Sequence, residues 1–230
     1  AYTNKVIALS PIAYWPMAES SGTTALDASG NARNGAYTAV TLGQPGIGDG
    51  RTAALFVPAS NSKNNVYSAS LAGAFNGAEG TIAAWFKVSA AGVWTDGAGR
   101  QVMVFAVNGS NSVRMNKNLV NSTFTWIYLA GGTTESRDRG STSPTGWTHV
   151  AMTWSKIADE VKYYLNGVQD GPTSTTLGIF AGAISATFTT VGAGDNTAAP
   201  GSIWDGYLAH AAVWATPLSA AQILSLATVP

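Results

Sequence analysis

The segment around Trp94 combines an aromatic ring with charged side chains in a pattern that suits ligand binding. Trp94 follows Ala90-Ala91-Gly92 and precedes Asp96-Gly97, outside the clear strand patterns of the chain. An aromatic ring on a loop can cover the apolar face of a sugar, while neighbouring polar groups bind its hydroxyls. We therefore predict a ligand-binding site at Trp94, Asp96 and Arg100. The alternative is that Trp94 covers the edge of the core.

Asp27 and Asn31 are the residues best placed to bind a cation. Asp27 precedes Gly30-Asn31 in a short polar loop, where backbone carbonyl oxygens can add to one carboxylate. Calcium takes about 6 to 8 oxygen ligands, so a calcium site at Asp27 and Asn31 needs further oxygens from this loop. The alternative is that the Asp27 side chain caps its own turn. No other cofactor is expected.

The acidic residues and the histidines do not form a catalytic pattern. Asp159-Glu160 is the only adjacent acidic pair, and neighbours in a strand point to opposite faces, so the two cannot share a substrate. We interpret His149 and His210, the two histidines of the chain, as residues of the core or between two sheets. We predict no catalytic residue and no enzymatic activity, and the alternative is a hydrolase with an unrecognised site.

Charge and composition exclude several classes of protein. Charged side chains make up 10% of the 230 residues, and twelve basic groups balance twelve acidic ones. Nucleic-acid binding is not expected, because the only arginine cluster, Arg137 and Arg139, has Glu135 and Asp138 beside it; we interpret these residues as a solvated loop. No apolar window reaches the ~20 residues of a membrane span. The lack of cysteine excludes disulfides and thiol catalysis.

Asn-Gly and Asp-Gly pairs recur along the chain and mark tight turns. Such turns need positive φ angles, which Gly adopts freely and which Asn and Asp tolerate. Between the turns lie short runs rich in β-branched and aromatic residues, which are typical of strands. The predicted strands are Thr81–Val88, Val102–Val107, Thr123–Leu129, His149–Trp154, Val161–Leu165, Thr187–Val191 and Tyr207–Trp214. The pattern predicts an all-β, antiparallel fold.

Three local patterns predict structure in more detail. Within Thr81–Val88, the alternate positions occupied by Ile82, Ala84, Phe86 and Val88 should face the core. Asn166-Gly167 should form a two-residue hairpin turn. Ser219 and Gln222 have the spacing of a capping box, and Leu218 and Ile223 that of a hydrophobic staple. A helix that starts after Ser219 should therefore pack against the body of the protein.

Segments spread over nearly the whole chain also match a known family in order and spacing. They are Ala13-Tyr14-Trp15-Pro16-Met17, Ser21-Gly22-Thr23-Thr24, Leu26–Asn31, Gly80–Trp85, Gly146–Trp154, Tyr164–Gly167, Trp204–His210 and Pro217–Ile223. Together they resemble the bacterial and phage laminin-G-like family within the concanavalin A-like lectin and glucanase superfamily. The resemblance implies a two-sheet antiparallel jelly-roll sandwich with a short C-terminal helix, and we expect residues 1–230 to form one such domain.

The chain departs from the family pattern at positions that bear on calcium and catalysis. Many members have a Phe-Asp-Gly strand end followed by acidic residues, whereas this chain reads Phe56–Asn61 without a carboxylate. Many carry an acidic pair in the last long strand, where this chain has Ala209 and His210. The Glu-x-Asp-x-Glu signature of the glucanases is absent as well. These departures weaken the expectation of an inherited calcium site.

The resemblance implies binding or attachment without fixing the ligand, because members of the family serve as glycan binders, adhesion modules and phage components. We predict a non-catalytic module, either a phage virion component (decoration, capsid- or tail-associated) or a bacterial surface adhesion module. The alternative is a lectin-type carbohydrate-binding domain, with or without calcium. Expected partners are other protein chains of a particle or surface assembly, including copies of this chain as a homo-oligomer, or glycans. The expected location is the virion surface or the extracellular space. The start at Ala1 without an apolar leader favours the particle.

Overall fold

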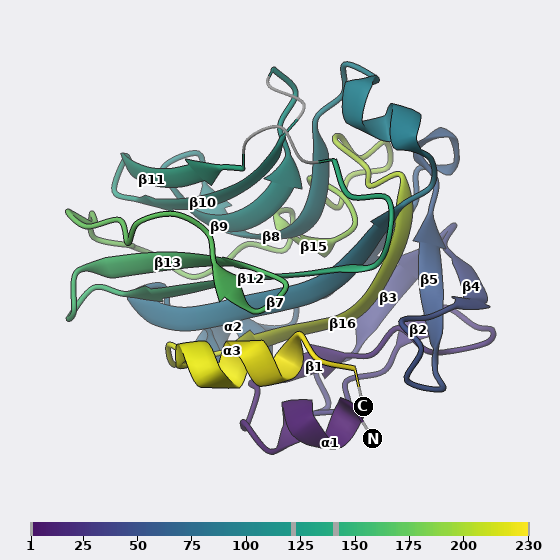
Figure 1. Cartoon of the computed structure of the whole chain (residues 1–230), viewed down its shortest axis with the longest axis horizontal. Coiled ribbons are helices and arrows are strands. Elements are labelled where there is room, and N and C mark those ends of the chain that lie inside the picture. The colour runs from purple at the N-terminus through teal and green to yellow at the C-terminus, as the bar shows by residue number, and fades with distance from the viewer. Residues whose placement is uncertain (1, 121–122, 140–142, 230) are drawn as a thin grey trace.

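In the computed structural model, which describes residues 2–120, 123–139 and 143–229, two antiparallel β-sheets pack face to face (Figure 1). Sheet A runs in the spatial order β14 (Val168–Gln169), β13 (Glu160–Leu165), β12 (Thr148–Ser155), β7 (Glu79–Val88), β16 (Gly206–Trp214), β5 (Thr52–Phe56) and β4 (Thr41–Pro45), and β1 (Ala13–Trp15) also pairs with β16. Sheet B runs in the order β11 (Thr133–Asp138), β10 (Phe124–Ala130), β9 (Asn111–Lys117), β8 (Arg100–Asn108), β15 (Thr189–Val191), β6 (Lys63–Asn65), β3 (Gly35–Thr38) and β2 (Thr24–Ala25). The predicted all-β sandwich is confirmed.

The core between the sheets is built from alternate residues of the long strands. On β7, Ile82, Ala84, Phe86 and Val88 belong to this core, as the alternation predicted. From sheet B, Phe124 stacks on Phe86 with ring centroids 5.0 Å apart. The aromatic residues therefore join the two sheets into one packed interior.

The opposite face of sheet A is also buried, because two helices cover it. α1 (Tyr2–Ile7) and α3 (Ala220–Leu226) lie side by side below the sheet in the view of Figure 1. Together with this face they form a second apolar cluster that includes Trp85 and Trp214. The hydroxyl of Tyr2 donates a hydrogen bond of 2.6 Å to the carbonyl of Leu226, so the two ends of the chain are tied together. No helix of the described residues is long and apolar enough to cross a membrane.

The predicted hairpin and C-terminal helix are both confirmed. Asn166 and Gly167 have φ angles of 46° and 82°, and they connect β13 to β14 with Leu165 opposite Val168. Ser219 and Gln222 form the reciprocal capping box at the start of α3. The helix buries Ile223 and Leu226 against sheet A, as expected for a helix that packs.

The predicted strands did not include β1 to β6, β9 and β11, and the interpretation of the segment from Glu135 to Arg139 was wrong. We expected a solvated loop there, but residues up to Asp138 form the edge strand β11. Arg137 and Arg139 both contact Asp170, whose side chain is almost fully buried. The mixed charges therefore serve an ion pair that attaches the edge of sheet B to the segment after β14.

We expect Ser219→Ala to lower the free energy of unfolding by about 1 kcal/mol, because it removes the hydroxyl that accepts the Gln222 backbone N–H. Ser225→Ala is the matched control, since Ser225 is an exposed residue inside the same helix. The control should be neutral or slightly stabilising, by up to about 0.5 kcal/mol. Urea unfolding of both variants measures the difference. Equal effects would show that the cap does not stabilise α3.

Candidate functional site

Trp94 does not offer a face to a ligand, so the alternative, that Trp94 covers the edge of the core, describes it better than the predicted binding site does. It lies in the short helical turn η2 (Ala91–Thr95) between β7 and β8, and its side chain is only 1% exposed. The ring packs edge-on against Phe86, with centroids 6.1 Å apart. Its indole N–H donates to the carbonyl of Pro144 at 3.0 Å. The ring is buried because the removal of so large an apolar surface from water stabilises the folded protein.

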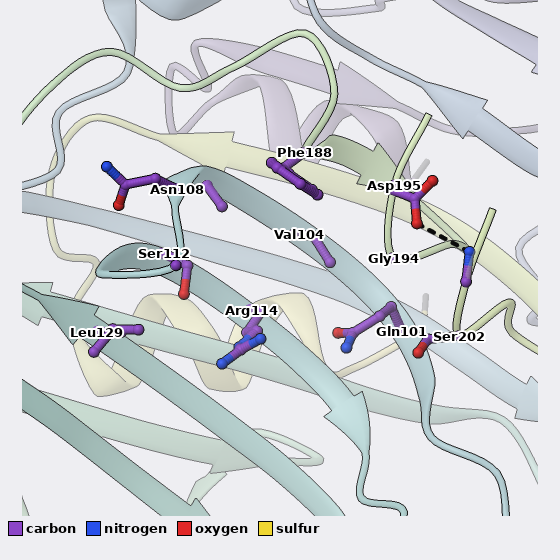
Figure 2. A pocket seen from close by; sticks show the side chains of 13 residues that line it. Gln101, Val104, Asn108, Ser112, Arg114, Leu129, Phe188, Gly194, Asp195 and Ser202 are labelled. Atoms are coloured by element: carbon purple, nitrogen blue, oxygen red, sulfur yellow. Dashed lines mark hydrogen bonds between the residues drawn. The ribbon is translucent and has the colours of Figure 1, made fainter. Parts of the chain in front are cut away.

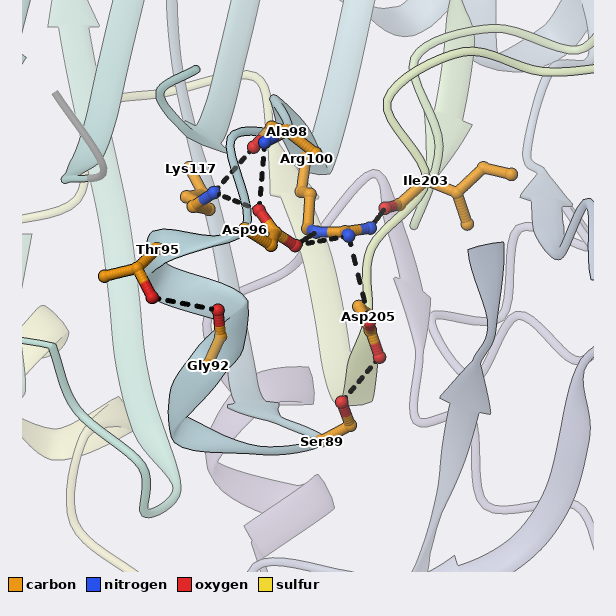
Figure 3. A network of polar contacts seen from close by, with 9 residues as sticks. All are labelled: Ser89, Gly92, Thr95, Asp96, Ala98, Arg100, Lys117, Ile203 and Asp205. Carbon is orange, nitrogen blue, oxygen red and sulfur yellow. Dashed lines mark hydrogen bonds and ion pairs between the residues drawn. The ribbon is translucent and has the colours of Figure 1, made fainter. Parts of the chain in front are cut away.

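Asp96 and Arg100 do come together, but Asp96 binds both Arg100 and a buried lysine (Figure 3). Nζ of Lys117, whose side chain has no exposed surface, donates to Oδ1 of Asp96 at 2.6 Å. Nε of Arg100 donates to Oδ2 of Asp96 at 2.7 Å. Burial raises the pKa of Asp96, but Lys117, the backbone N–H of Ala98 and Arg100 outweigh it and hold that pKa below its usual value.

The same network connects two distant segments at the rim of the sandwich. A guanidinium N–H of Arg100 donates to the carbonyl of Ile203 at 2.9 Å, and Arg100 also lies 3.8 Å from Asp205. The hydroxyl of Ser89 donates to the other oxygen of Asp205 at 2.5 Å. Because most of these polar atoms already have protein partners, the network positions the rim loops. Ligand binding by Asp96 and Arg100 stays a prediction.

The loop at Asp27 and Asn31 does not provide the oxygens that calcium needs. Oδ1 of Asp27 accepts the backbone N–H groups of Tyr14 and Ser29, and Oδ2 accepts that of Arg33, each at 2.9 Å. The amide nitrogen of Asn31 donates to the carbonyls of Pro11 and Ile12. Within the described residues no three acidic, histidine or cysteine side chains converge as a metal site. Both side chains stabilise the loop, so the capped turn describes Asp27 better than a calcium site.

His149 and His210 lie under the helices and not between the sheets. His149 is fully buried beside the edge of Trp85, and burial, with a smaller effect of His210, lowers its pKa to about 3. Nδ1 of His210 lies 2.6 Å from the hydroxyl of Tyr14. Its Nε2 lies 3.1 Å from a carboxylate oxygen of Asp49, at ion-pair distance but not aligned as a hydrogen bond. Both histidines are therefore core residues that no substrate can reach.

A pocket of about 290 Å³ lies elsewhere, on the face of sheet B that points away from the core (Figure 2). We call it the sheet-B pocket, and the sequence did not predict it. Its lining residues come from β8, β9, β10 and the segments that flank β15. They are Gln101, Val104, Ala106, Asn108, Gly109, Ser112, Arg114, Leu129, Phe188, Gly194, Asp195, Gly201 and Ser202.

The floor of the sheet-B pocket is polar, and several of its buried atoms lack partners. Oε1 of Gln101, Oγ of Ser112 and Nε of Arg114 are shielded from solvent and have no hydrogen-bond partner among the described residues. Ser112 is only 3% exposed. An unpaired buried polar group costs roughly 1 to 3 kcal/mol, so each of these atoms needs a partner, and in an open pocket a ligand can provide it as well as ordered water.

The walls of the pocket add an aromatic ring and a carboxylate. Phe188, which immediately precedes β15, is 40% exposed and is the only aromatic side chain of the lining. Asp195 is the only carboxylate of the lining, and it accepts the backbone N–H of Gly201 at 2.9 Å. In the view of Figure 2, Phe188 and Asp195 lie above Gln101 and Arg114, and the Gln101 side chain extends toward Arg114. This arrangement suits binding by stacking and hydrogen bonds.

A signal for this site exists in the sequence of β9. Polar Ser112, Arg114 and Asn116 alternate there with apolar Val113 and Met115. The period of two predicts a strand with one apolar face and one polar face. The three polar residues are nevertheless largely buried in the structure, and only the fold reveals this combination.

Comparison with known proteins identifies the fold family. Residues 60–224 match the model of the concanavalin A-like lectin/glucanases superfamily. Comparison with curated protein sequences gives no significant match.

Several solved structures share the fold at low sequence identity. Domain 4 of an extracellular arabinanase from Geobacillus stearothermophilus, solved with arabinotriose, has a TM-score of 0.67 and 18% identity over 95% of this chain and 98% of the domain. The binding domain of botulinum neurotoxin serotype D has a TM-score of 0.66 and 15% identity over 95% of this chain, which spans 51% of that domain. Trypanosoma rangeli sialidase has a TM-score of 0.67 and 11% identity over 95% of this chain, which spans 32% of the enzyme.

If the Asp96 network is structural, its two ends should respond unequally to mutation. Asp96→Asn leaves the buried ammonium of Lys117 without an anion and should cost about 2 to 3 kcal/mol of unfolding free energy. Lys117→Met should cost about 1 kcal/mol or less, because Asp96 keeps Arg100 and is partly exposed. Chemical denaturation compares the two. If Asp96→Asn had the stability of the wild type, the wild-type carboxylate would not be needed for folding and would be free to bind a ligand.

The buried state of His149 predicts a loss of stability in acid. Its pKa is about 3 in the folded protein and close to 6.5 in the unfolded chain. Stability from the neutral ring is therefore complete above about pH 6.5 and falls as the pH drops toward 3, by at most about 1.4 kcal/mol per pH unit.

The variant His149→Phe keeps an aromatic ring but removes this proton equilibrium. Its unfolding free energy should fall less steeply than that of the wild type between pH 6.5 and 4, measured by urea unfolding at each pH. Acid sensitivity from His210 and the carboxylates remains in both proteins and cancels in the difference. Parallel curves would contradict the assignment.

Proposed function

This chain belongs to the concanavalin A-like lectin/glucanases superfamily, and we propose that it is a non-catalytic carbohydrate-binding module whose site is the sheet-B pocket. The observation that carries the proposal is the row of buried, unpartnered polar atoms of Gln101, Ser112 and Arg114 beside the exposed ring of Phe188. A sugar has one apolar face and many hydroxyls, so it can satisfy both kinds of surface at once.

Each part of the pocket has a role in this proposal. The ring of Phe188 covers the apolar face of a sugar ring. Oε1 of Gln101 and the carboxylate of Asp195 accept hydrogen bonds from hydroxyls, while the guanidinium of Arg114 donates. Ligand pockets span about 300 to 1,000 Å³. With about 290 Å³, the sheet-B pocket suits a short saccharide segment.

The similar structures support a saccharide as the ligand class. The arabinanase domain, which this chain matches over nearly its full length, was solved in complex with arabinotriose. The similar toxin domain is described as a binding domain. In our proposal the module attaches a larger assembly, such as a virion or a bacterial surface structure, to a glycan-coated surface.

Phe188→Ala should weaken saccharide binding on the order of tenfold, because it removes the only aromatic surface of the pocket. A glycan array identifies the ligands, and titration calorimetry with the strongest one measures the affinity. Leu224→Ala is the matched control, since Leu224 is an exposed apolar residue on α3, which covers the other sheet.

The array should be run with and without a chelator, which tests the expectation of calcium assistance at the same time. Binding that survives the chelator agrees with the absence of suitable oxygens at Asp27 and Asn31. The proposal fails if no saccharide binds, or if Phe188→Ala keeps the affinity of the wild type, as the control Leu224→Ala should.

A further inference from the structure

Arg114 differs from the other buried or partly buried cations of sheet B because its side chain has no partner among the described residues. Lys63 on β6 donates to the carbonyl of Thr197. Lys117 and Arg100 contact Asp96, and the two arginines of the β11 edge contact Asp170. Among the described residues, no carboxylate forms an ion pair with Arg114. A partly buried guanidinium without an anion is costly, so its position in the floor of a pocket calls for an explanation.

Burial at this position disfavours the charge that the side chain carries. Nε of Arg114 is shielded from solvent and has no hydrogen-bond partner among the described residues. Desolvation by the surrounding strands lowers the pKa of Arg114 from its usual value. A bound anion would reverse this effect, because an opposite charge within hydrogen-bond distance favours the charged form.

The only carboxylate of the pocket already has partners. Oδ1 of Asp195 accepts the backbone N–H of Thr197 at 2.9 Å and its hydroxyl at 2.6 Å, and Oδ2 accepts the N–H of Gly201. Figure 2 shows Asp195 apart from Arg114, with the bond from Gly201 drawn as a dashed line. The pocket thus presents a cation in its floor and an anion on its wall, which do not neutralise each other by contact.

We propose that the sheet-B pocket is selective for a saccharide that carries a carboxylate, and that the guanidinium of Arg114 binds this carboxylate. This inference rests on the proposed function and names its ligand class: a uronic acid or another carboxylated sugar. The planar guanidinium matches a carboxylate with two parallel N–H···O bonds. Hydroxyls of the same sugar donate to Asp195 and Gln101, and its apolar face lies on Phe188.

The single cation of the lining also argues against more highly charged ligands. A sugar with several sulfate groups would meet only one guanidinium, and it would be repelled by Asp195. A neutral sugar would leave the desolvated charge of Arg114 without compensation. One carboxylate, bound at the floor and away from Asp195, is the charge that Arg114 balances.

The test uses matched pairs of saccharides that differ only in this charge. The probes are trigalacturonate and sialyllactose, each compared with its methyl ester, which keeps the shape and removes the charge. Titration calorimetry measures the affinity of the wild type and of Arg114→Gln. Lys162→Gln is the control, because it removes one positive charge from sheet A, far from the pocket.

We expect the wild type to bind at least one carboxylate form on the order of tenfold to a hundredfold more tightly than its ester. Arg114→Gln should lose this preference, while Lys162→Gln keeps it. Arg114→Gln should also be at least as stable as the wild type in urea, because it removes a buried charge that has no protein partner. This stability measurement separates lost binding from lost folding.

Three other results overturn the inference in distinguishable ways. Equal binding of acid and ester, with both lost in Phe188→Ala, would leave the proposed carbohydrate site standing and refute the role of Arg114. If Arg114→Gln still bound the carboxylate form more tightly than the ester, the carbohydrate site would stand and the role of Arg114 would be refuted. No binding of any probe, in either form, would overturn the inference, and a glycan array without any hit would overturn the proposed function with it.

Discussion

The outer faces of the two sheets differ in chemistry, and this difference decides where a ligand can bind. The long strands of sheet A are buried on both faces. Their outer face carries alanine and tryptophan side chains, which pack under α1 and α3. The outer face of sheet B carries the polar side chains of Gln101, Ser112 and Arg114, each of which has a buried atom without a partner among the described residues. Apolar burial is self-sufficient, whereas polar burial needs partners. Unpartnered polar atoms occur under the helices too, at His149 and His210, but those are enclosed, whereas the ones on sheet B line a pocket.

The rim, where the sequence patterns predicted a site, holds a polar network that positions its loops. Lys117 at the end of β9 holds Asp96, and Arg100 at the start of β8 joins Asp96 to the segment before β16. These contacts fix the loops that border the sheet-B pocket, since Ile203 and Asp205 follow directly on Ser202. Trp94 contributes by filling the edge of the core. The predicted binding residues thus support the structure around the pocket.

Local patterns predicted the fold well but did not predict the sheet-B pocket, for physical reasons. The alternation in β7, the Asn166-Gly167 turn and the Ser219 cap are set by residues close in sequence, so they are readable without a structure. The pocket assembles residues about 100 positions apart, such as Gln101 and Asp195, which only the sheet order brings together. The strand β16 contains a bulge between Ala209 and Ala212. The bulge shifts the alternation of the side chains, so the face of the sheet to which His210 points could not be predicted from its neighbours in the sequence.

The location of the bound saccharide is the most direct test of this account. Crystals of the protein soaked with trigalacturonate or sialyllactose should show the sugar on the outer face of sheet B, with its ring against Phe188 and its carboxylate at Arg114. A sugar bound instead at the rim beside Asp96, or on the face covered by α1 and α3, would contradict the claim that buried polar atoms mark the site.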